Sequence, residues 1–203
     1  MSRPGTFERV YAALKAQLRE GKFRPGDRLE PAMLSEQLNA SVTPVRDALH
    51  RLTGERLVEA PRHEGFRVPL LTETTLRHLY AWHRDLLLLA VASRRWRELS
   101  SAAEAGLCPT AGDHAERQSA LFLAIAHTTG NPEHALALDA LSDRLGPLHR
   151  LETLLLDAVE EETAEIMNAV ERKDARALRA ALVRYHRRRE RIVPELLERL
   201  YAH

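Results

Sequence analysis

Two helix-start signals lie close together in the first quarter of the chain and constrain its fold more than any other feature. Pro31 opens a short segment with apolar residues at helical spacing that ends near Leu38. A hydroxyl residue, Ser41, then precedes Pro44 in a second segment that extends to Arg56. A hydroxyl at the N-cap and a proline in the first turn both favour a helix start. The pattern predicts two helices joined by a tight turn.

A helix before this pair and a hairpin after it complete a small domain. Apolar residues recur at helical spacing from Phe7 to Glu20. Two strand-like runs, residues 57–60 and 66–69, flank the segment Pro-Arg-His-Glu-Gly and predict a hairpin. Three helices plus a β-hairpin define a winged helix-turn-helix over residues 1–71. In that fold the third helix enters the DNA major groove and the hairpin, or wing, contacts the neighbouring backbone or minor groove.

The remainder of the chain, residues 72–203, predicts an all-α bundle of five to six helices, so the fold class is mainly α. Thr72 is placed to cap a long helix with a broad apolar face. Further helices are expected at 113–128, 132–145, 148–172 and 175–201. Their predicted breaks are Gly130-Asn-Pro132, Gly146-Pro147 and Arg172-Lys-Asp174, and Pro194 is expected to kink or shorten the last helix.

Charge and composition narrow the class of partner. Residues 1–71 hold 12 Lys/Arg against 9 Asp/Glu, and the rest hold 18 against 20, so only the first part is net positive. This asymmetry favours a polyanion partner for that part. The longest apolar stretch, residues 86–92, is far below the roughly 20 residues of a membrane span. With no secretory signal and a single cysteine, Cys108, we expect a cytoplasmic protein without a membrane partner.

Motifs for catalysis are missing from the sequence. It has no Gly-rich phosphate loop, no Gly-x-Ser-x-Gly elbow and no His-Glu-x-x-His pair. The acidic run 160–162 and the basic run 187–191 fit solvated helix surfaces. We therefore expect neither an enzyme nor a bound cofactor.

The N-terminal motifs resemble those of the GntR superfamily of transcription regulators, in its FadR-like branch with an all-helical (FCD-type) C-terminal domain. The similar stretches are Gly21-Lys-Phe-Arg-Pro-Gly-Asp-Arg-Leu29, Leu34-Ser-Glu-Gln-Leu38, Ser41-Val-Thr-Pro-Val-Arg-Asp-Ala-Leu49, Leu52 through Leu57-Val58, and Gly65-Phe-Arg-Val68. Fainter similarity continues at Thr129-Gly-Asn131 and from Asp174 to His186. The resemblance implies a homodimer that binds double-stranded operator DNA.

The resemblance also assigns residues to DNA. On the third helix these are Ser41, Thr43 and Arg46, and on the wing they are Arg62, His63, Gly65 and Arg67. Three positions depart from the family pattern, because Val42 and Ala32 stand where arginines are found and Glu64 precedes the wing glycine. An arginine on guanine is worth about 1–3 kcal/mol of discrimination, so we expect an altered operator.

Many members of this branch bind a divalent metal through an aspartate and three histidines. The corresponding positions here are Gln118, Phe122, Thr163 and Tyr185. Because these side chains cannot make a zinc-type site, we expect no metal there, and a different site that uses His149 or His186 stays open. Near the effector cavity of the family, this chain has His83 and Leu87. Two interpretations remain: the six residues line a pocket for a fairly apolar effector, or their side chains fill the cavity.

These observations favour a homodimeric repressor whose helical domains place two recognition helices on an inverted repeat. Trp82 and Trp96 are expected in the core or the dimer interface. The alternative is an interaction module whose winged helix has lost specific DNA binding, which Val42, Ala32 and Glu64 suggest. Salt-dependent binding to duplex DNA separates the two.

Overall fold

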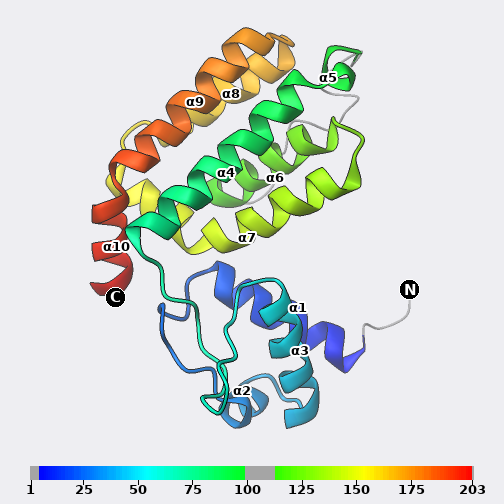
Figure 1. Cartoon of the computed structure of the whole chain (residues 1–203), viewed down its shortest axis with the longest axis vertical. Helices are drawn as coiled ribbons and strands as arrows, with labels where there is room; N and C mark the ends of the chain where they lie inside the picture. Colours follow the sequence, from blue (N-terminus) through cyan, green and yellow to red (C-terminus); the bar gives the residue numbers. More distant parts are fainter. Residues whose placement is uncertain (1–4, 99–112, 203) are drawn as a thin grey trace.

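Two hydrophobic cores lie end to end along the molecule in the computed structural model, which describes residues 5–98 and 113–202 (Figure 1). The smaller core is built from residues between Val10 and Phe66. The larger core is built from residues between Leu76 and Leu200. The expected free Cys108 lies outside the described residues.

Three helices surround the smaller core: α1 (Thr6–Arg19), α2 (Pro31–Gln37) and α3 (Val42–Gly54). All three helices predicted in this part of the sequence are confirmed to within two residues. Arg9 of α1 donates hydrogen bonds to the carbonyls of Leu38 (2.8 Å) and Asn39 (3.1 Å), and so holds the turn between α2 and α3. Asn39 has a positive φ of 47°, which asparagine tolerates better than most residues. The helix-turn-helix is therefore fixed by its own first helix.

The wing differs from the predicted hairpin, because no extended strands form among the described residues. A single antiparallel pair closes it: Glu59 and Arg67 exchange two backbone hydrogen bonds, at 2.8 and 2.9 Å. On its other side the returning segment bonds to the chain before α2, with the Leu29 amide donating to the Phe66 carbonyl at 2.8 Å. Pro61 and Pro69 limit the ladder, since proline has no N–H to donate.

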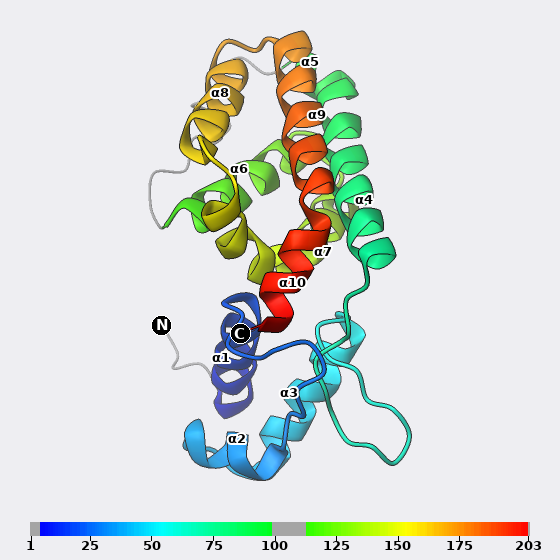
Figure 2. The same cartoon turned by 90° about the vertical axis from the view of Figure 1, so that its left-hand side faces the viewer.

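Helices alone form the larger core in the described part of the chain. They are α4 (Glu73–Ala92), α5 (Arg94–Glu98), α6 (His114–His127), α7 (Pro132–Leu155), α8 (Val159–Glu171), α9 (Ala175–Arg191) and α10 (Val193–Ala202). In Figures 1 and 2, α4 and α9 run side by side along one face of the bundle. The predicted cap at Thr72 is confirmed, because its side chain accepts a hydrogen bond from a first-turn amide. The side chains of Asp113, Asn131 and Asp174 cap three further helices in the same way.

The predicted break at Gly146-Pro147 is wrong, because α7 continues through both residues. A proline inside a helix removes one backbone hydrogen bond and costs about 3 kcal/mol. Burial of the apolar face of α7, including Leu138, Leu145 and Leu148, outweighs that cost. The chain breaks instead at residues 156–158, where Ala158 has a positive φ of 56°.

The last predicted helix is interrupted as expected near Pro194. Helix α9 ends at Arg191, and α10 begins at Val193 with Pro194 in its first turn, where a missing N–H costs little. This interruption and the short α5 explain why the described bundle has seven helices and not five to six. None of the described helices has the length and apolar character that a membrane span requires.

Candidate nucleic-acid interface

The start of α3 lies at the end of the molecule farthest from the helical bundle, whereas its last turn faces the bundle (Figures 1 and 2). One side of α3 is buried, through Val45, Ala48, Leu49 and Leu52. The opposite side exposes Ser41, Thr43 and Arg46, which are the three positions that the sequence assigned to DNA. The fold therefore brings these three side chains together on one open surface.

The first turn of α3 has unused hydrogen-bonding groups. Ser41 is the N-cap residue, yet its side chain accepts no hydrogen bond from the helix. The amides of a first turn have no partner within the helix and carry its positive dipole end, which favours a phosphate oxygen. Among the described residues, the exposed Arg46 forms no ion pair that would compete for its guanidinium. This end of α3 is thus suited to bind an anion.

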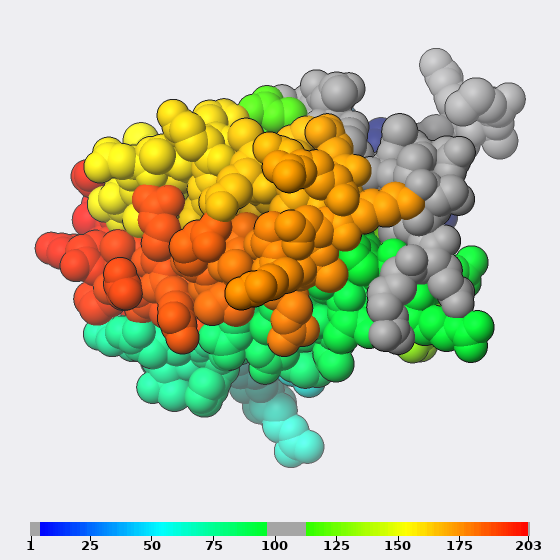
Figure 3. Space-filling view, turned by 90° about the horizontal axis from the view of Figure 1, so that it is seen from above, coloured from blue at the N-terminus to red at the C-terminus, as the bar shows by residue number. Residues whose placement is uncertain are grey.

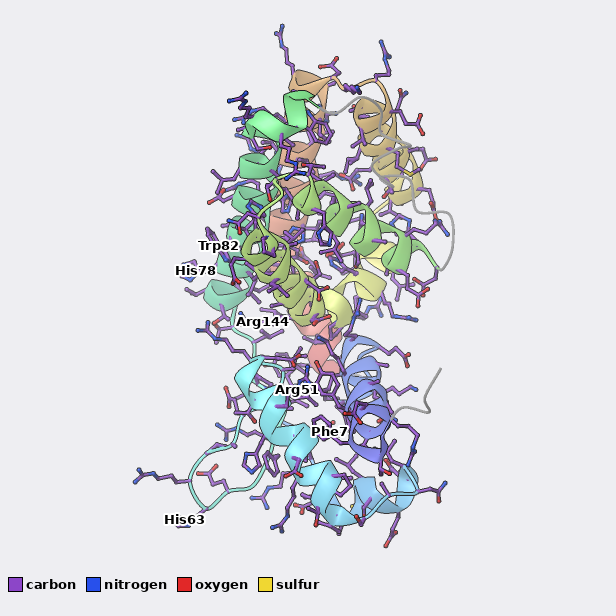
Figure 4. All side chains as sticks on the ribbon, turned by 90° about the vertical axis from the view of Figure 1, so that its right-hand side faces the viewer. Phe7, Arg51, His63, His78, Trp82 and Arg144 are labelled. Carbon is purple, nitrogen blue, oxygen red and sulfur yellow. The ribbon has the colours of Figure 1, made fainter. Side chains whose placement is uncertain are left out.

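Arg62, His63 and Gly65 lie together at the exposed tip of the wing, with His63 at its edge in Figure 4. Positive φ angles at His63 (65°) and Gly65 (78°) turn the backbone there. Seen from above, turquoise atoms of this segment protrude beyond the outline of the helical bundle (Figure 3). The tip is therefore free to reach a partner that lies against α3.

Arg67 stands apart from the other assigned wing residues because two acids already hold its guanidinium. Its Nε lies 3.0 Å from Glu59 and its terminal nitrogen lies 3.4 Å from Glu64. Its side chain is only half-exposed. The wing's own glutamate thus neutralises one of its arginines, and a phosphate would have to displace these contacts.

Sequence reasoning did not identify an apolar element of this surface. Met33 on α2 is 61% exposed and Val42 at the start of α3 is 37% exposed. Both belong to the helix-turn-helix, whose second and third helices pack together. Exposed apolar groups on such a surface can contact the methyl group of thymine. The sequence does contain a signal for this surface, because Met33 and Val42 are apolar residues at helix positions outside the buried face.

Arg51, farther along α3, is used within the protein. Its guanidinium lies 4.1 Å from the ring centre of Tyr11, and its Nε lies 3.4 Å from Glu55. The Tyr11 hydroxyl also donates to Glu55 at 2.6 Å. The recognition helix therefore divides into a free first half and a second half that is tied to α1.

The six residues assigned to an effector pocket are also brought together, in the centre of the bundle. Tyr185 donates to Gln118 at 3.0 Å, and Gln118 donates to Thr163 at 3.3 Å. The Phe122 ring lies edge-on to both Tyr185 (5.1 Å) and His83 (5.2 Å). These five residues and Leu87 are at most 5% exposed. Hydrogen bonds and ring contacts thus join five of the six side chains directly, and Leu87 is buried in the same core.

Two of the central histidines have a defined tautomer. His186 Nδ1 lies 2.7 Å from the Leu182 carbonyl, which can only accept, so this nitrogen carries a proton. His186 Nε2 is then the acceptor of the 2.9 Å bond from His83 Nδ1. His83 Nε2 is left buried without a partner among the described residues. Burial lowers the pKa of His83 well below its usual value and lowers the pKa of His186 to about 3.

A buried ion-pair network adjoins these histidines and overturns one sequence expectation, because Arg189 of the basic run is not solvated but fully buried. Its guanidinium bonds to Glu152 (2.8 Å) and Glu162 (2.5 Å), joining α7, α8 and α9. Burial alone would raise the pKa of Glu152, but the charges of His149 and Arg189 outweigh it and lower that pKa. The network is electrostatically complementary.

Charged residues also join the two cores. Asp143 of α7, which is 2% exposed, lies 2.6 Å from Lys15 Nζ and 3.3 Å from Arg19 Nε, both of α1. Lys15 also pairs with Glu55 at the end of α3, at 3.0 Å. The contacts thus run from the recognition helix through α1 to the bundle.

A helix-turn-helix with an exposed recognition helix, followed by a helical bundle, defines a class of two-part helix-turn-helix proteins. The sequence model described as "Bacterial regulatory proteins, gntR family" matches residues 6–68. Among curated relatives, the Escherichia coli HTH-type transcriptional regulator McbR is 39% identical over 79 residues, which are 39% of this chain and 36% of McbR. The E. coli HTH-type transcriptional repressor GlaR is 33% identical over 34% of this chain and 32% of GlaR. These alignments span about a third of each curated relative.

The likeness in structure extends over nearly the whole chain. The E. coli McbR/YncC structure has a TM-score of 0.74 and 25% identity, covering 95% of this chain and 99% of that one. A GntR-type regulator structure from a Rhodococcus species shares the fold, with a TM-score of 0.74, 20% identity, and coverage of 93% of this chain and 97% of that one. Residues 6–68 therefore carry a helix-turn-helix of the GntR type, and a helical domain like that of these solved structures follows it.

Proposed function

We propose that this protein is a cytoplasmic transcription regulator that binds double-stranded DNA sequence-specifically and acts as a homodimeric repressor. Residues 1–71 bind the operator and residues 72–203 pair the two protomers. The observation that carries the proposal is the exposed first half of α3, where Ser41, Thr43 and Arg46 share one face and Arg46 has no ion pair with the described residues. The match of residues 6–68 to a family of bacterial regulatory proteins supports the same conclusion.

Selection of binding sites from random duplex DNA tests this proposal. An enriched inverted repeat, with half-sites about 34–36 Å apart, is expected for a dimer. The affinity should fall linearly with salt on logarithmic axes, because bound phosphates release counterions. Without any enriched sequence, the interaction module that has lost specific DNA binding becomes the better description.

Two arginines on α3 provide a matched test of the DNA contacts. Arg46→Ala should cost about 1–3 kcal/mol of discrimination at one base pair of the selected operator. Arg51→Ala should leave that discrimination unchanged, because Arg51 stacks on Tyr11 and pairs with Glu55. Equal specificity for the wild type and Arg46→Ala would show that the recognition surface is wrongly placed.

An exposed stripe on α4 supports the homodimer. Its members are His78, Trp82, Asp85 and Leu89, spaced so that they lie on one side of the helix. His78 and Trp82 point outward from the bundle in Figure 4, and Trp82 and Leu89 are 48% and 57% exposed. Of the two tryptophans expected in the core or the interface, Trp96 is in the core at 2% exposure.

The molar mass in solution tests this surface. Trp82→Glu should convert a dimer to a monomer, because the new carboxylate would replace a large apolar contact and be desolvated without a partner. Leu154→Glu, at a residue of α7 that is 66% exposed, is the control and should stay dimeric. A dimer that persists in Trp82→Glu would exclude the α4 stripe as the contact.

A small, fairly apolar effector is the last part of the proposal. His83, Leu87, Gln118, Phe122, Thr163 and Tyr185 remain its predicted pocket, but they would have to separate before a ligand could enter. Such an opening would break the Tyr185–Gln118 and Gln118–Thr163 hydrogen bonds. A ligand acts on DNA binding only by its different affinity for the two arrangements.

A further inference from the structure

A small cavity lies at the junction of the two cores, away from the six central residues. Its volume is about 60 Å³. The N-terminal part contributes Leu18 and Leu57 to its lining, and the linker between the wing and α4 contributes Leu71. The bundle contributes Pro147 and Leu200. Its wall is mostly apolar and comes from both parts of the chain. A molecule bound here would touch both at once.

Two arginines complete the lining. Arg56 directly follows α3, and Arg144 lies on α7. Neither guanidinium has a hydrogen bond or an ion pair with the described residues. Burial and, second, the charge of Arg56 lower the pKa of Arg144. Figure 4 shows Arg144 on the side of the bundle that faces the N-terminal part. Two like charges therefore meet at an apolar cavity without an anion between them.

The residues that line the cavity include one acid, Asp143, but it does not neutralise the two arginines. Asp143 lies next to Arg144 in the sequence, but its carboxylate is held by Lys15 at 2.6 Å and by Arg19 at 3.3 Å. The second nearby acid, Glu55, is held by Lys15, Tyr11 and Arg51. The cations of α1 thus neutralise the acids of the junction, and the positive charge of Arg56 and Arg144 remains.

From this geometry we infer that the junction cavity is a binding site for a short apolar carboxylate, whose anion lies between Arg56 and Arg144 while its alkyl group enters the cavity. Guanidinium groups match the planar geometry of a carboxylate. A volume of about 60 Å³ corresponds to about four water molecules and sets the size of the alkyl group. The site is separate from the proposed DNA surface, because the first turn of α3 lies at the opposite end of that helix (Figure 2).

The site connects the recognition helix with the bundle, since Arg56 follows α3 and Arg144 belongs to α7. A carboxylate that bridges them would favour the arrangement in which the two parts stay docked. The effect of the carboxylate on operator affinity rests on the proposed function. The binding of the carboxylate to the protein without DNA does not, so binding and the effect on operator affinity are measured separately.

Titration of the full-length protein with isovalerate, without DNA, tests the site by the amide NMR shifts of residues 56 and 144. Isovaleramide is the control ligand, because it has the same shape without the charge. A ligand this small should bind with a Kd in the millimolar range. The amide should bind at least tenfold more weakly. Equal binding of acid and amide, or no saturation at tens of millimolar, would overturn the proposal.

Variants on one helix then locate the anion. Arg144→Gln should weaken isovalerate binding at least tenfold, whereas Arg150→Gln should not, because Arg150 lies outside this cavity and pairs with Asp113 at 3.0 Å. Unchanged binding in Arg144→Gln would overturn the assignment, and circular dichroism confirms that both variants are folded. A wild type that binds isovalerate but no DNA sequence would refute the proposed function and leave this site standing.

Discussion

Protonation of the His83–His186 pair opposes folding, because both imidazoles are held neutral in the core. The pKa of His186 is lowered by burial to about 3, against about 6.5 in an unfolded chain. Below pH 6.5 the unfolded state therefore binds more protons than the folded state, and stability falls with falling pH until about pH 3. His83, with its pKa also lowered, acts in the same direction.

Urea unfolding at a series of pH values measures this effect. His186 should contribute about 2 kcal/mol of lost stability between pH 7 and pH 5, and His83 should add to the loss in the same direction. His186→Gln should reduce the slope by up to one proton, because it removes one of the two buried neutral imidazoles. A slope that is the same in His186→Gln and the wild type would contradict the neutral pair.

Arg189 is the residue whose replacement should destabilise the bundle most. Removing one partner of a buried ion pair leaves an uncompensated charge and costs about 3–5 kcal/mol. Arg189→Met should show this loss in denaturant unfolding, and replacing Glu152 and Glu162 by glutamine in the same variant should recover part of it. The control is Arg184→Met, since Arg184 pairs with Glu165 on the surface and should cost less than about 1 kcal/mol.

Arg189 also illustrates why the burial and the partners of a single side chain could not be predicted from the sequence. The run Arg187-Arg-Arg-Glu-Arg191 has the composition of a solvated helix face. The two acids that pair with Arg189 in the core lie 27 and 37 positions earlier in the sequence. The six central residues were predicted to gather because their positions follow a family pattern. Whether their side chains would enclose space or fill it depended on packing that no local pattern specifies.

Secondary-structure elements were predictable where a local signal decides them. The caps at Thr72, Asp113 and Asp174 and the break near Pro194 arise from side chains adjacent to the helix ends. The continuity of helix α7 was not predictable, because burial of its apolar face and its close packing on α1 outweigh the local signal at Gly146-Pro147. A Cβ at Gly146 would lie 2.9 Å from the carbonyl oxygen of Arg19 on α1. Tertiary packing has overruled a local helix-breaking signal there.

The close approach of α1 and α7 gives a prediction at this scale. Gly146→Ala should destabilise the protein by about 1–3 kcal/mol, because the added methyl group meets backbone that cannot rotate away. In Gly54→Ala the new methyl group meets nothing within 4 Å, so helix propensity should stabilise the protein by up to about 1 kcal/mol. Thermal unfolding compares the two, and a stabilised Gly146→Ala would mean that the helices do not approach so closely.

At the scale of the whole molecule, two hydrophobic cores behave as one unit only if the contacts between them are strong enough. Asp143 is central to these contacts, because its buried carboxylate holds both Lys15 and Arg19 of α1. The hydroxyl of Tyr201 on α10 adds bonds of 3.0 Å to the amide and the carbonyl of Leu71 in the linker. The first contact is ionic and buried, and the second lies at the surface.

Asp143→Asn should uncouple the two cores. Both tryptophans belong to helices of the bundle, α4 and α5, so fluorescence follows the bundle alone while circular dichroism follows all helices. The two urea curves should coincide in the wild type, as two-state unfolding requires. In Asp143→Asn the circular dichroism should begin to fall at lower urea than the fluorescence, because the smaller core loses its support. Glu165→Gln, at an exposed residue of α8, should keep the curves coincident, and coincident curves in Asp143→Asn would place the coupling elsewhere.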